Sequence, residues 1–237
     1  MTTYFVTGTD TDAGKTLVAS GLLALAQRHG RTTLGLKPVA SGCDSTPQGL
    51  RNIDALTLRA QSEPAPAYTT INPYAYAPAI APHLAARRVG EAPTLDDLIT
   101  ATTAPLAEKR GLTLIEGAGG WRVPLNDTED LAGLAVRLGL PVILVVGLKL
   151  GCLNHARLTA EAIRADGLPL AGWVGNLTDP GLSFNTAADA DCYHDNLATL
   201  ERTLNAPCLG IVPRLTADTP AMRAASAADH LALPGDE

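Results

Sequence analysis

The sequence of 237 residues predicts an α/β fold with a doubly wound, mainly parallel sheet and helices on both of its faces. Short runs rich in β-branched residues alternate along the chain with longer segments of helical composition. The runs are apolar at nearly every position, as in residues 141–146, which is typical of parallel strands buried on both sides. Because 46% of the residues are hydrophobic, the chain can bury a large core without disulfides or a structural metal, so we expect one domain over residues 1–237.

The expected elements alternate between strand and helix. Six strands are predicted, over residues 3–7, 33–39, 112–116, 142–146, 170–174 and 208–212. Five helices are predicted, over residues 15–29, 95–110, 129–138, 155–166 and 187–204. A glycine, the residue that commonly ends a helix, follows each of the first four, at Gly30, Gly111, Gly139 and Gly167. This order favours crossover connections between parallel strands.

Residues 42–82 are rich in Pro, Ser, Thr and Asn and interrupt the alternation. We expect loops around one short helix there rather than a linker, because three tyrosines and an isoleucine still offer apolar surface to bury. No element is assigned beyond about residue 216, and residues 234–237 are expected to be disordered.

The charge and hydropathy of the chain limit the classes of partner that it is expected to bind. A net charge of -6 disfavours an extended nucleic-acid or acidic-membrane surface, so we expect small ligands. No stretch reaches the roughly 18 apolar residues of a membrane span, and the first residues start a strand rather than a leader. These observations predict a cytoplasmic protein with neither nucleic acid nor membrane as a partner.

The four cysteines lie far apart along the sequence, at Cys43, Cys152, Cys192 and Cys208. They form no CxxC pair and lie near no ladder of histidines, which argues against a zinc site and against a disulfide framework. We expect all four to be reduced thiols.

A glycine-rich segment, residues 8–16, follows the first predicted strand and opens the first predicted helix. It has the character of a phosphate-binding loop, although five residues rather than the usual four separate its glycines. Gly14 has no Cβ to block a phosphate, and the helix N-terminus behind it favours an anion. Lys15 is expected to meet the β- and γ-phosphates and Thr16 to offer its hydroxyl to magnesium. We therefore expect a P-loop NTPase-like fold that binds ATP with Mg2+, rather than an ordinary glycine-rich turn.

Polar residues stand at the carboxyl ends of the next predicted strands, where doubly wound sheets bind ligands. Glu116 ends an apolar run and enters a glycine cluster; a carboxylate there is costly without a cation, so magnesium is the expected partner rather than a structural hydrogen bond. Lys37 ends the second predicted strand and is expected to project at the same edge, against the alternative of a solvated lysine. Asp54 could equally be a metal ligand or a surface residue in the first turn of a helix.

A second candidate anion site lies at residues 146–155, which combine glycine, lysine and asparagine just before a predicted helix. Asn154 fits a helix N-cap, and the free N–H groups there suit a substrate carboxylate, although capping alone explains the residue equally well. Asn176, after the fifth predicted strand, suits a contact with an adenine edge or a turn. Cys152 and His155 belong to no recognisable nucleophile arrangement, so covalent catalysis gains little support.

Seven segments in order give the chain its resemblance to a known family, at residues 4–16, 37–42, 49–54, 116–121, 141–147, 149–155 and 170–174. Together they resemble the dethiobiotin synthetases, whose phosphate loop has this five-residue spacing. The resemblance implies an ATP-dependent carboxylation and ring closure of 7,8-diaminononanoate (diaminopelargonic acid) with CO2. The reaction passes through a carbamate and a carbamic-phosphoric anhydride to dethiobiotin, ADP and phosphate, in biotin biosynthesis.

The resemblance also implies roles for particular residues. Lys37 and Lys15 would be catalytic, and magnesium would be held by Thr16, Asp54 and Glu116. ATP would be bound by Asp12, Ala13, Gly14, Lys15, Thr16, Leu17, Asp54, Glu116, Gly117, Ala118 and Gly119, with Asn176, Val212, Pro213 and Arg214 at the base. The diamine would be bound by Ser41 and, across a homodimer interface, by Gly151, Cys152, Leu153, Asn154 and Tyr193. Arg214 departs from the family pattern, which has an aromatic residue there.

Two other functions compete with this interpretation. An amide-forming ligase of the cobyrinic acid diamide synthase type shares the style of phosphate loop but carries a glutamine-hydrolysing domain, for which 237 residues leave no room. A switch ATPase of the partitioning type acts through partner binding rather than through a product. Such proteins place a second lysine where this chain has Asp10, and they tend to carry a basic or amphipathic surface segment that this sequence lacks.

Overall fold

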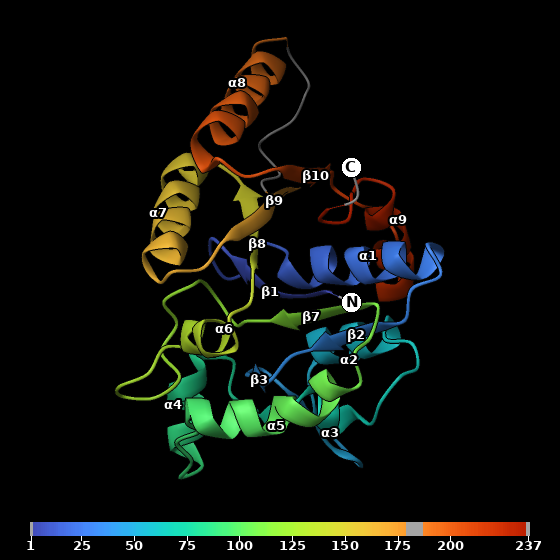
Figure 1. Cartoon of the computed structure of the whole chain (residues 1–237), viewed down its shortest axis with the longest axis vertical. Helices are drawn as coiled ribbons and strands as arrows, with labels where there is room; N and C mark the ends of the chain where they lie inside the picture. Colours follow the sequence, from blue (N-terminus) through green and yellow to red (C-terminus); the bar gives the residue numbers. More distant parts are fainter. Residues whose placement is uncertain (1, 179–186, 236–237) are drawn as a thin grey trace.

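A six-stranded sheet forms the centre of the molecule (Figure 1). The computed structural model describes residues 2–178 and 187–235, without the side chains of residues 187–192. The strand order is β10-β9-β8-β1-β7-β2, and every neighbouring pair is parallel. The strands are Thr2–Gly8 (β1), Thr33–Leu36 (β2), Leu112–Glu116 (β7), Val142–Leu148 (β8), Leu170–Leu177 (β9) and Cys208–Val212 (β10). The predicted parallel sheet is confirmed.

Helices cover both faces of this sheet, as expected. They are Lys15–Arg28 (α1), Ile53–Ala60 (α2), Tyr68–Ile71 (α3), Pro82–Arg88 (α4), Leu95–Ala107 (α5), Ala132–Leu138 (α6), Cys152–Ala165 (α7), Ala187–Leu204 (α8) and Pro220–Ala228 (α9). Successive side chains of β1 point to opposite faces: Val6 packs into a core with α1 and α9, whereas Phe5 packs into a core with α5 and α6. The sheet is therefore doubly wound, with a separate apolar layer on each face.

The direction in which strands are added reverses at β1. On one side of β1 lie β7 and β2, and on the other lie β8, β9 and β10. In open α/β sheets this reversal opens a crevice at the carboxyl ends of the strands, where ligands bind. The loop after Gly8 therefore begins at the place where the topology itself favours a ligand.

The second strand is shorter than the sequence predicts, because the expectation of one strand over residues 33–39 is wrong. β2 ends at Leu36, and Val39–Ala40 (β3) pairs with Tyr74–Ala75 (β6) outside the main sheet. Pro38 has no N–H to donate to a ladder, so the chain leaves the sheet there. Lys37 consequently lies one residue beyond the strand end, in a loop.

Residues 42–82 contain more structure than the single short helix expected from their composition. They hold the helices α2 and α3, the strand β6, and an antiparallel hairpin of Asp44–Thr46 (β4) and Gly49–Arg51 (β5). Each element is shorter than the window over which periodicity can be recognised, which explains why the prediction missed them.

The helix predicted over residues 129–138 begins only at Ala132. The residues before it form a turn instead, in which the side-chain oxygen of Asn126 accepts hydrogen bonds from the backbone N–H groups of Thr128 and Glu129. Such local bonds from asparagine compete with helix formation.

The helix predicted over residues 95–110 ends early, at Ala107. Lys109 takes the left-handed conformation that ends it, with φ of 51°, so Gly111 is not the terminating residue. Pro105 in its last turn weakens the helix at this end.

The C-terminal segment carries a helix, α9, that the sequence did not predict, and α4 was missed in the same way. α9 is rich in alanine and packs closely on α1, since a Cβ added at Gly21 would lie 2.9 Å from the Cβ of Ala227. Small residues on both sides allow this contact. Pro234 and Gly235 form a turn, so the expected disorder is wrong for them, while residues 236–237 lie outside the described residues.

Two further expectations concern membranes and thiols. Among the described residues, no helix has the length and apolarity needed to cross a membrane. Cys43, Cys152 and Cys208 are free thiols, and the side chain of Cys192 lies outside the described part of the chain.

Candidate active site

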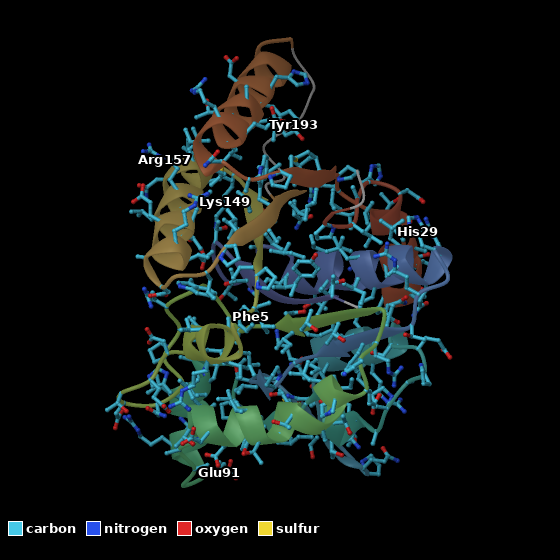
Figure 2. All side chains as sticks on the ribbon, in the orientation of Figure 1. Phe5, His29, Glu91, Lys149, Arg157 and Tyr193 are labelled. Atoms are coloured by element: carbon cyan, nitrogen blue, oxygen red, sulfur yellow. The ribbon has the colours of Figure 1, made fainter. Side chains whose placement is uncertain are left out.

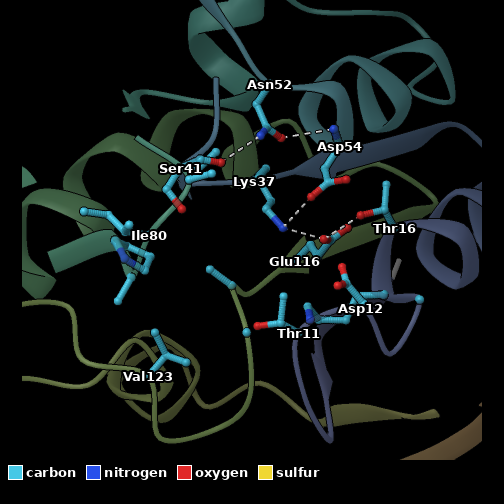
Figure 3. A pocket seen from close by; sticks show the side chains of 18 of the residues that line it. Thr11, Asp12, Thr16, Lys37, Ser41, Asn52, Asp54, Ile80, Glu116 and Val123 are labelled. Carbon is cyan, nitrogen blue, oxygen red and sulfur yellow. Dashed lines mark hydrogen bonds and ion pairs between the residues drawn. The ribbon is translucent and has the colours of Figure 1, made fainter. Parts of the chain in front are cut away.

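A cavity of about 690 Å3 opens at the carboxyl ends of β1, β2 and β7 (Figure 3). Its walls come from the loop before α1, the loops after β2 and β3, the start of α2, and the loop after β7. The predicted site residues that line it are Asp12, Gly14, Lys15, Thr16, Leu17, Lys37, Ser41, Asp54, Glu116, Ala118 and Gly119. Segments far apart in the sequence thus converge on one space.

The phosphate loop has the backbone that close approach of an anion requires. Gly14 precedes α1 with φ of 95°, a left-handed conformation, and the helix start has no side-chain cap among the described residues. The first N–H groups of α1 are therefore open to a ligand. Lys15 curls back over the loop, where its Nζ donates to the carbonyl of Asp10 at 3.0 Å.

Asn176 braces this loop from the end of β9. Its side-chain nitrogen donates to the carbonyl of Ala13 at 3.0 Å, and a Cβ added at Gly14 would lie 2.0 Å from that nitrogen. The sequence left an adenine contact and a turn as alternatives for Asn176, and this bond to the phosphate loop was not among them. Gly14 is therefore required both by its backbone angle and by the asparagine packed against it.

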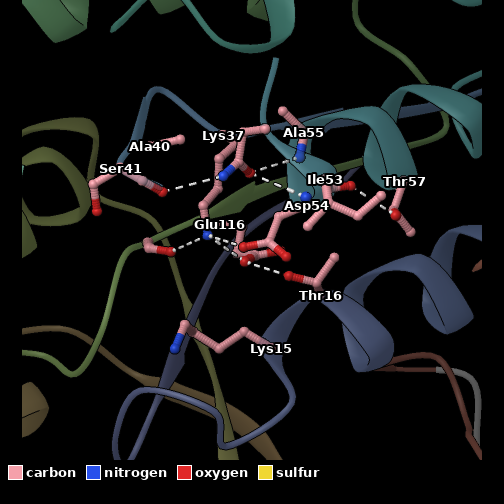
Figure 4. A network of polar contacts seen from close by, with 12 residues as sticks. Lys15, Thr16, Lys37, Ala40, Ser41, Ile53, Asp54, Ala55, Thr57 and Glu116 are labelled. Carbon is pink, nitrogen blue, oxygen red and sulfur yellow. Dashed lines mark hydrogen bonds and ion pairs between the residues drawn. The ribbon is translucent and has the colours of Figure 1, made fainter. Parts of the chain in front are cut away.

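A cluster of charged side chains, of which Lys37 and Glu116 are buried, lies beside the loop in the cavity (Figure 4). Lys37 is 4% exposed, and its Nζ lies 2.5 Å from Oε1 of Glu116 and 3.3 Å from Oδ2 of Asp54. It also donates to the carbonyl of Gly117 at 3.0 Å. Thr16 donates its hydroxyl to the same oxygen of Glu116 at 2.8 Å. One carboxylate oxygen thus joins the phosphate loop to the lysine.

The two lysines of the cavity have pKa values shifted in opposite directions. Burial alone lowers the pKa of Lys37, but the adjacent carboxylates of Glu116 and Asp54 outweigh it and raise the pKa above the ordinary value. Burial also lowers the pKa of Lys15, and the positive charge of Lys37 lowers it further. Lys37 is therefore a fixed cation, while Lys15 lacks a counter-anion strong enough to offset its burial.

The donor set around Glu116 fits a divalent cation that prefers oxygen. Oε2 of Glu116 is buried and has no hydrogen-bond partner among the described residues. Leaving a buried carboxylate oxygen unpaired costs free energy, and a cation would recover it. The oxygens of Thr16 and Asp54 belong to the same cavity. Two carboxylates and a hydroxyl suit Mg2+, which keeps several waters and binds phosphate oxygens.

Some residues of the cavity were not predicted from the sequence. Asn52 lies at its wall, 5% exposed, directly before α2. Its position before a helix is the signature of an N-cap, so this signal was present. Residues 79–82 also line the cavity, but their apolar side chains carry no chemical signal that a sequence analysis could use.

The second predicted anion site lies elsewhere. Within the described ranges, residues 151–154 and Tyr193 are not part of the cavity wall; Gly151 precedes α7, residues 152–154 form the first turn of this helix, and Tyr193 lies on α8 (Figures 1 and 2). The helix predicted over residues 155–166 begins at Cys152, because Gly151, with φ of 92°, serves as its N-cap. Asn154 is therefore inside α7, and its prediction as an N-cap is wrong.

The residues expected at the base of ATP are also separate from the cavity wall. Val212 ends β10 and is fully buried, Pro213 is half-buried, and Arg214 is exposed. They follow the strand next to β9, which ends near Asn176. The structure therefore groups the four residues at one sheet edge without bringing them into the cavity.

Comparison with known proteins supplies a family. A family model described as an AAA domain matches residues 2–221. An ATP-dependent dethiobiotin synthetase BioD from Chromohalobacter salexigens is 82% identical over 236 residues, which cover 100% of this chain and 100% of the relative. This chain belongs to the dethiobiotin synthetase family. The family resemblance found in the sequence is thereby confirmed.

Two solved structures share the fold of this chain. The MinC:MinD cell division protein complex of Aquifex aeolicus has a TM-score of 0.56 at 11% identity, covering 97% of this chain and 94% of that chain. A ParA family ATPase from Chlorobium tepidum has a TM-score of 0.54 at 12% identity, covering 95% and 90%. At such identities the likeness shows the fold alone, and it confirms the P-loop NTPase-like class.

The likeness to these two proteins does not favour the switch interpretation. Asp10 stands where such proteins were expected to carry a second lysine, and its Oδ2 lies 3.4 Å from Nζ of Lys149. The same side chain accepts a hydrogen bond from the backbone of Thr11. A carboxylate thus occupies the place of the expected lysine, in a chain that shares its sequence with the synthetases.

Proposed function

We propose that this chain is an ATP-dependent dethiobiotin synthetase, which makes dethiobiotin from 7,8-diaminononanoate, CO2 and ATP and releases ADP and phosphate. The observation that carries the proposal is one cavity that combines an open phosphate loop with the buried pair of Lys37 and Glu116 and the half-buried Asp54. The 82% identity to a protein named as a synthetase supports the same reaction.

The reaction has three steps in this proposal. One amine of the diamine captures CO2 as a carbamate, whose oxygen attacks the γ-phosphate of ATP. The second amine then attacks the carbamic-phosphoric anhydride, displaces phosphate and closes the urea ring. The residues of this chain act by position and charge, since phosphoryl transfer needs little covalent participation by the protein. Lys15 and Lys37 would stabilise the negative charge that develops on the transferred group, and Ser41 would contact the diamine.

The phosphates are assigned to residues 12–17 and to the loop after Glu116. Residues 12–17 supply backbone N–H groups and the start of α1, and Ala118 and Gly119 line the opposite wall. The adenine base is assigned to Asn176, Val212, Pro213 and Arg214. Support for this second assignment comes from the bond between Asn176 and the phosphate loop, which ties the end of β9 to the nucleotide site.

Mg2+ is assigned to Thr16, Asp54 and Glu116, supported by the unpaired, buried Oε2 of Glu116. When bound, the ion would neutralise charge on the phosphate oxygens. Removing it with EDTA is expected to abolish dethiobiotin formation. Asp54→Asn is expected to raise the Mg2+ concentration for half-maximal rate by about tenfold, because one anionic ligand is lost. Titration of the rate with Mg2+ measures this, and an unchanged midpoint would remove Asp54 from the metal site.

The diamine's carboxylate is assigned to residues 151–154 and Tyr193 of a second copy of the chain, in a homodimer. Support comes from the position of this turn outside the cavity wall and from the two exposed leucines beside it. Leu150 is 97% exposed and Leu158 on α7 is 57% exposed, as expected for a helix that a partner covers. We also propose that residues 1–237 form a single domain and that the enzyme acts in the cytoplasm.

The test is to incubate the purified protein with Mg2+, ATP, bicarbonate and the diamine, and to follow dethiobiotin by mass spectrometry and phosphate release in parallel. Each component is omitted in turn. Product only in the complete mixture, with one phosphate per ring, would establish the reaction. Phosphate release that is indifferent to the diamine, without dethiobiotin, would instead support a switch ATPase.

A further inference from the structure

Three side chains of the proposed site come from segments outside the main sheet. Lys37 lies just after β2, Ser41 just after β3, and Asp54 in the first turn of α2. The hydrogen bonds of the central sheet end at Leu36 and so do not fix these segments relative to one another. Other contacts must hold them in a common geometry.

Asn52 ties two of the three segments together. Its side-chain oxygen accepts from the backbone N–H of Asp54 at 3.0 Å and so caps α2. Its side-chain nitrogen donates to the carbonyl of Ser41 at 3.3 Å, as Figure 3 shows. A single buried side chain thus sets the start of α2 against the loop after β3.

Asn72 holds the third segment from the other side. It is 2% exposed, and its side-chain nitrogen donates to the carbonyl of Lys37 at 2.8 Å and to that of Tyr74 at 3.1 Å. The backbone N–H of Lys37 also donates to the carbonyl of Ile71 at 2.8 Å. The lysine's backbone is therefore held on both sides by the end of α3.

Tyr68 joins these two asparagines. Its hydroxyl accepts from the backbone N–H of Asn52 at 2.8 Å and donates to the side-chain oxygen of Asn72 at 2.9 Å. Burial raises its pKa, so the hydroxyl remains a donor throughout the neutral range. The guanidinium of Arg51 lies 4.2 Å from the centre of its ring, and the ring packs on the core. The hydroxyl is thus held in place by contacts of its own ring.

We propose that Asn52, Tyr68 and Asn72 form a positioning network for the synthetase reaction, with the Tyr68 hydroxyl as its central link. The proposal rests on the proposed function. Tyr68 is not among the residues that line the cavity, so it would act through the two asparagines. The network would hold the ammonium of Lys37 in register with the diamine at Ser41 and with the carboxylate of Asp54. The phosphate loop makes none of the hydrogen bonds described for the network.

The central test compares Tyr68→Phe with Tyr74→Phe. Tyr68→Phe removes both hydrogen bonds and leaves the ring to pack; Tyr74→Phe removes the hydroxyl of the next tyrosine, which is also absent from the cavity wall. For Tyr68→Phe we expect kcat to fall about 30-fold at a temperature well below Tm, since small displacements of reacting groups lower rates strongly. The KM for ATP should stay within twofold. Tyr74→Phe should keep wild-type kcat.

A second variant tests the link from Asn52 to Ser41 separately from the link through Tyr68. Asn52→Ser keeps a good N-cap for α2 but is too short to reach the carbonyl of Ser41. We expect the KM for the diamine to rise about tenfold while kcat and the KM for ATP change less than threefold. Should Tyr68→Phe fail to fold, this variant carries the test alone.

The outcomes distinguish the network from the proposed function. A wild-type protein that makes no dethiobiotin would overturn the function and the positioning role with it. An active wild type with kcat within twofold in Tyr68→Phe, whatever its Tm, would overturn the positioning role alone. In Asn52→Ser, an unchanged KM for the diamine would overturn the link to Ser41.

Discussion

The starts of α1 and α7 have nearly the same backbone but lie in different surroundings. Each helix follows a left-handed glycine, Gly14 with φ of 95° and Gly151 with φ of 92°, and neither start has a side-chain cap within the described residues. The start of α1 opens into the cavity beside Lys15 and Lys37. The start of α7 follows Leu150, which is 97% exposed. An open helix start that can bind an anion therefore occurs twice in the chain. Only the start of α1 lies in a cavity that also contains lysines of the same chain.

This difference supports the proposed division of the site between two copies of the chain. An open helix start favours an anion, but strong binding in water also needs burial and neighbouring charge. The α1 start has both within one chain. The α7 start would gain them on association, which is why we assign it to the cavity of a partner.

The largest effect is expected at the centre of the cavity, in Lys37→Gln. The variant removes the fixed cation that lies 2.5 Å from Glu116, so dethiobiotin formation should fall by about 1,000-fold. ATP binding, which depends on the loop before α1, should stay within about fivefold, as calorimetry would show. Lys109→Gln, which neutralises an exposed lysine, is the charge-matched control. Near-normal turnover in Lys37→Gln would remove this lysine from the mechanism.

The proposed division of the active site between two chains can be tested by mixing two inactive variants. Asn154→Asp places a negative charge in the first turn of α7, which is proposed to bind the substrate carboxylate, and it should be inactive alone by charge repulsion. Mixed with Lys37→Gln, half of the dimers would carry both variants, and each of these would have one intact site. About a quarter of wild-type activity should then appear, because the interface is symmetric. If the mixture after subunit exchange remains as inactive as its components, the turn and the cavity lysine act in the same chain.

Matched glycine substitutions compare the two helix starts directly. A Cβ at Gly14 would lie 2.0 Å from the side-chain nitrogen of Asn176, whereas nothing described lies within 4 Å of a Cβ at Gly151. Gly14→Ala should therefore displace the brace on the phosphate loop and weaken ATP binding by more than tenfold. Gly151→Ala should cost only the backbone strain, about 1 kcal/mol, and leave ATP binding unchanged. Thermal unfolding and ATP titration of both variants measure the contrast; equal losses of ATP affinity would break it.

The sequence predicted the cavity better than its surroundings. The glycine spacing before Lys15 and the carboxylate at the end of an apolar run, Glu116, follow from local rules, and the sheet brings them together because both end parallel strands. The network around Tyr68 could not be predicted in this way. Its hydrogen bonds join short elements whose pairing depends on tertiary packing, and no periodic pattern records it.

The helices that were missed or misplaced show the same limit of prediction from sequence. α9 is rich in alanine, and its close contact with Gly21 of α1 depends on tertiary packing that residue type does not record. Asn154 has the residue type of an N-cap, but the left-handed Gly151 takes that place three residues earlier. Residue type alone does not reveal which of two candidates starts a helix.

The smallest effect is expected at the start of α5, where side chains of the helix itself cap the first N–H groups. Thr94 and Asp97 form a capping box, and hydrogen bonds from the backbone and then the hydroxyl of Thr94 lower the pKa of Asp97. A carboxylate with a lowered folded pKa stabilises the fold above its unfolded pKa of about 3.9, and this contribution is lost as the pH falls through the folded value. Asp97→Asn should therefore lower Tm at pH 7, and the difference from wild type should shrink towards pH 3.

Thermal unfolding at the two pH values measures this, with Asp44→Asn, at another exposed aspartate, as the matched control. The KM values for ATP and the diamine should stay unchanged, because a capped helix start has already satisfied the N–H groups that α1 and α7 leave open. A Tm difference that persists undiminished at pH 3 would show that the charge of Asp97 is not what stabilises α5. Altered KM values would mean that a capped helix start also affects ligand binding. The start of α5 could then no longer serve as the inactive reference for the open starts of α1 and α7.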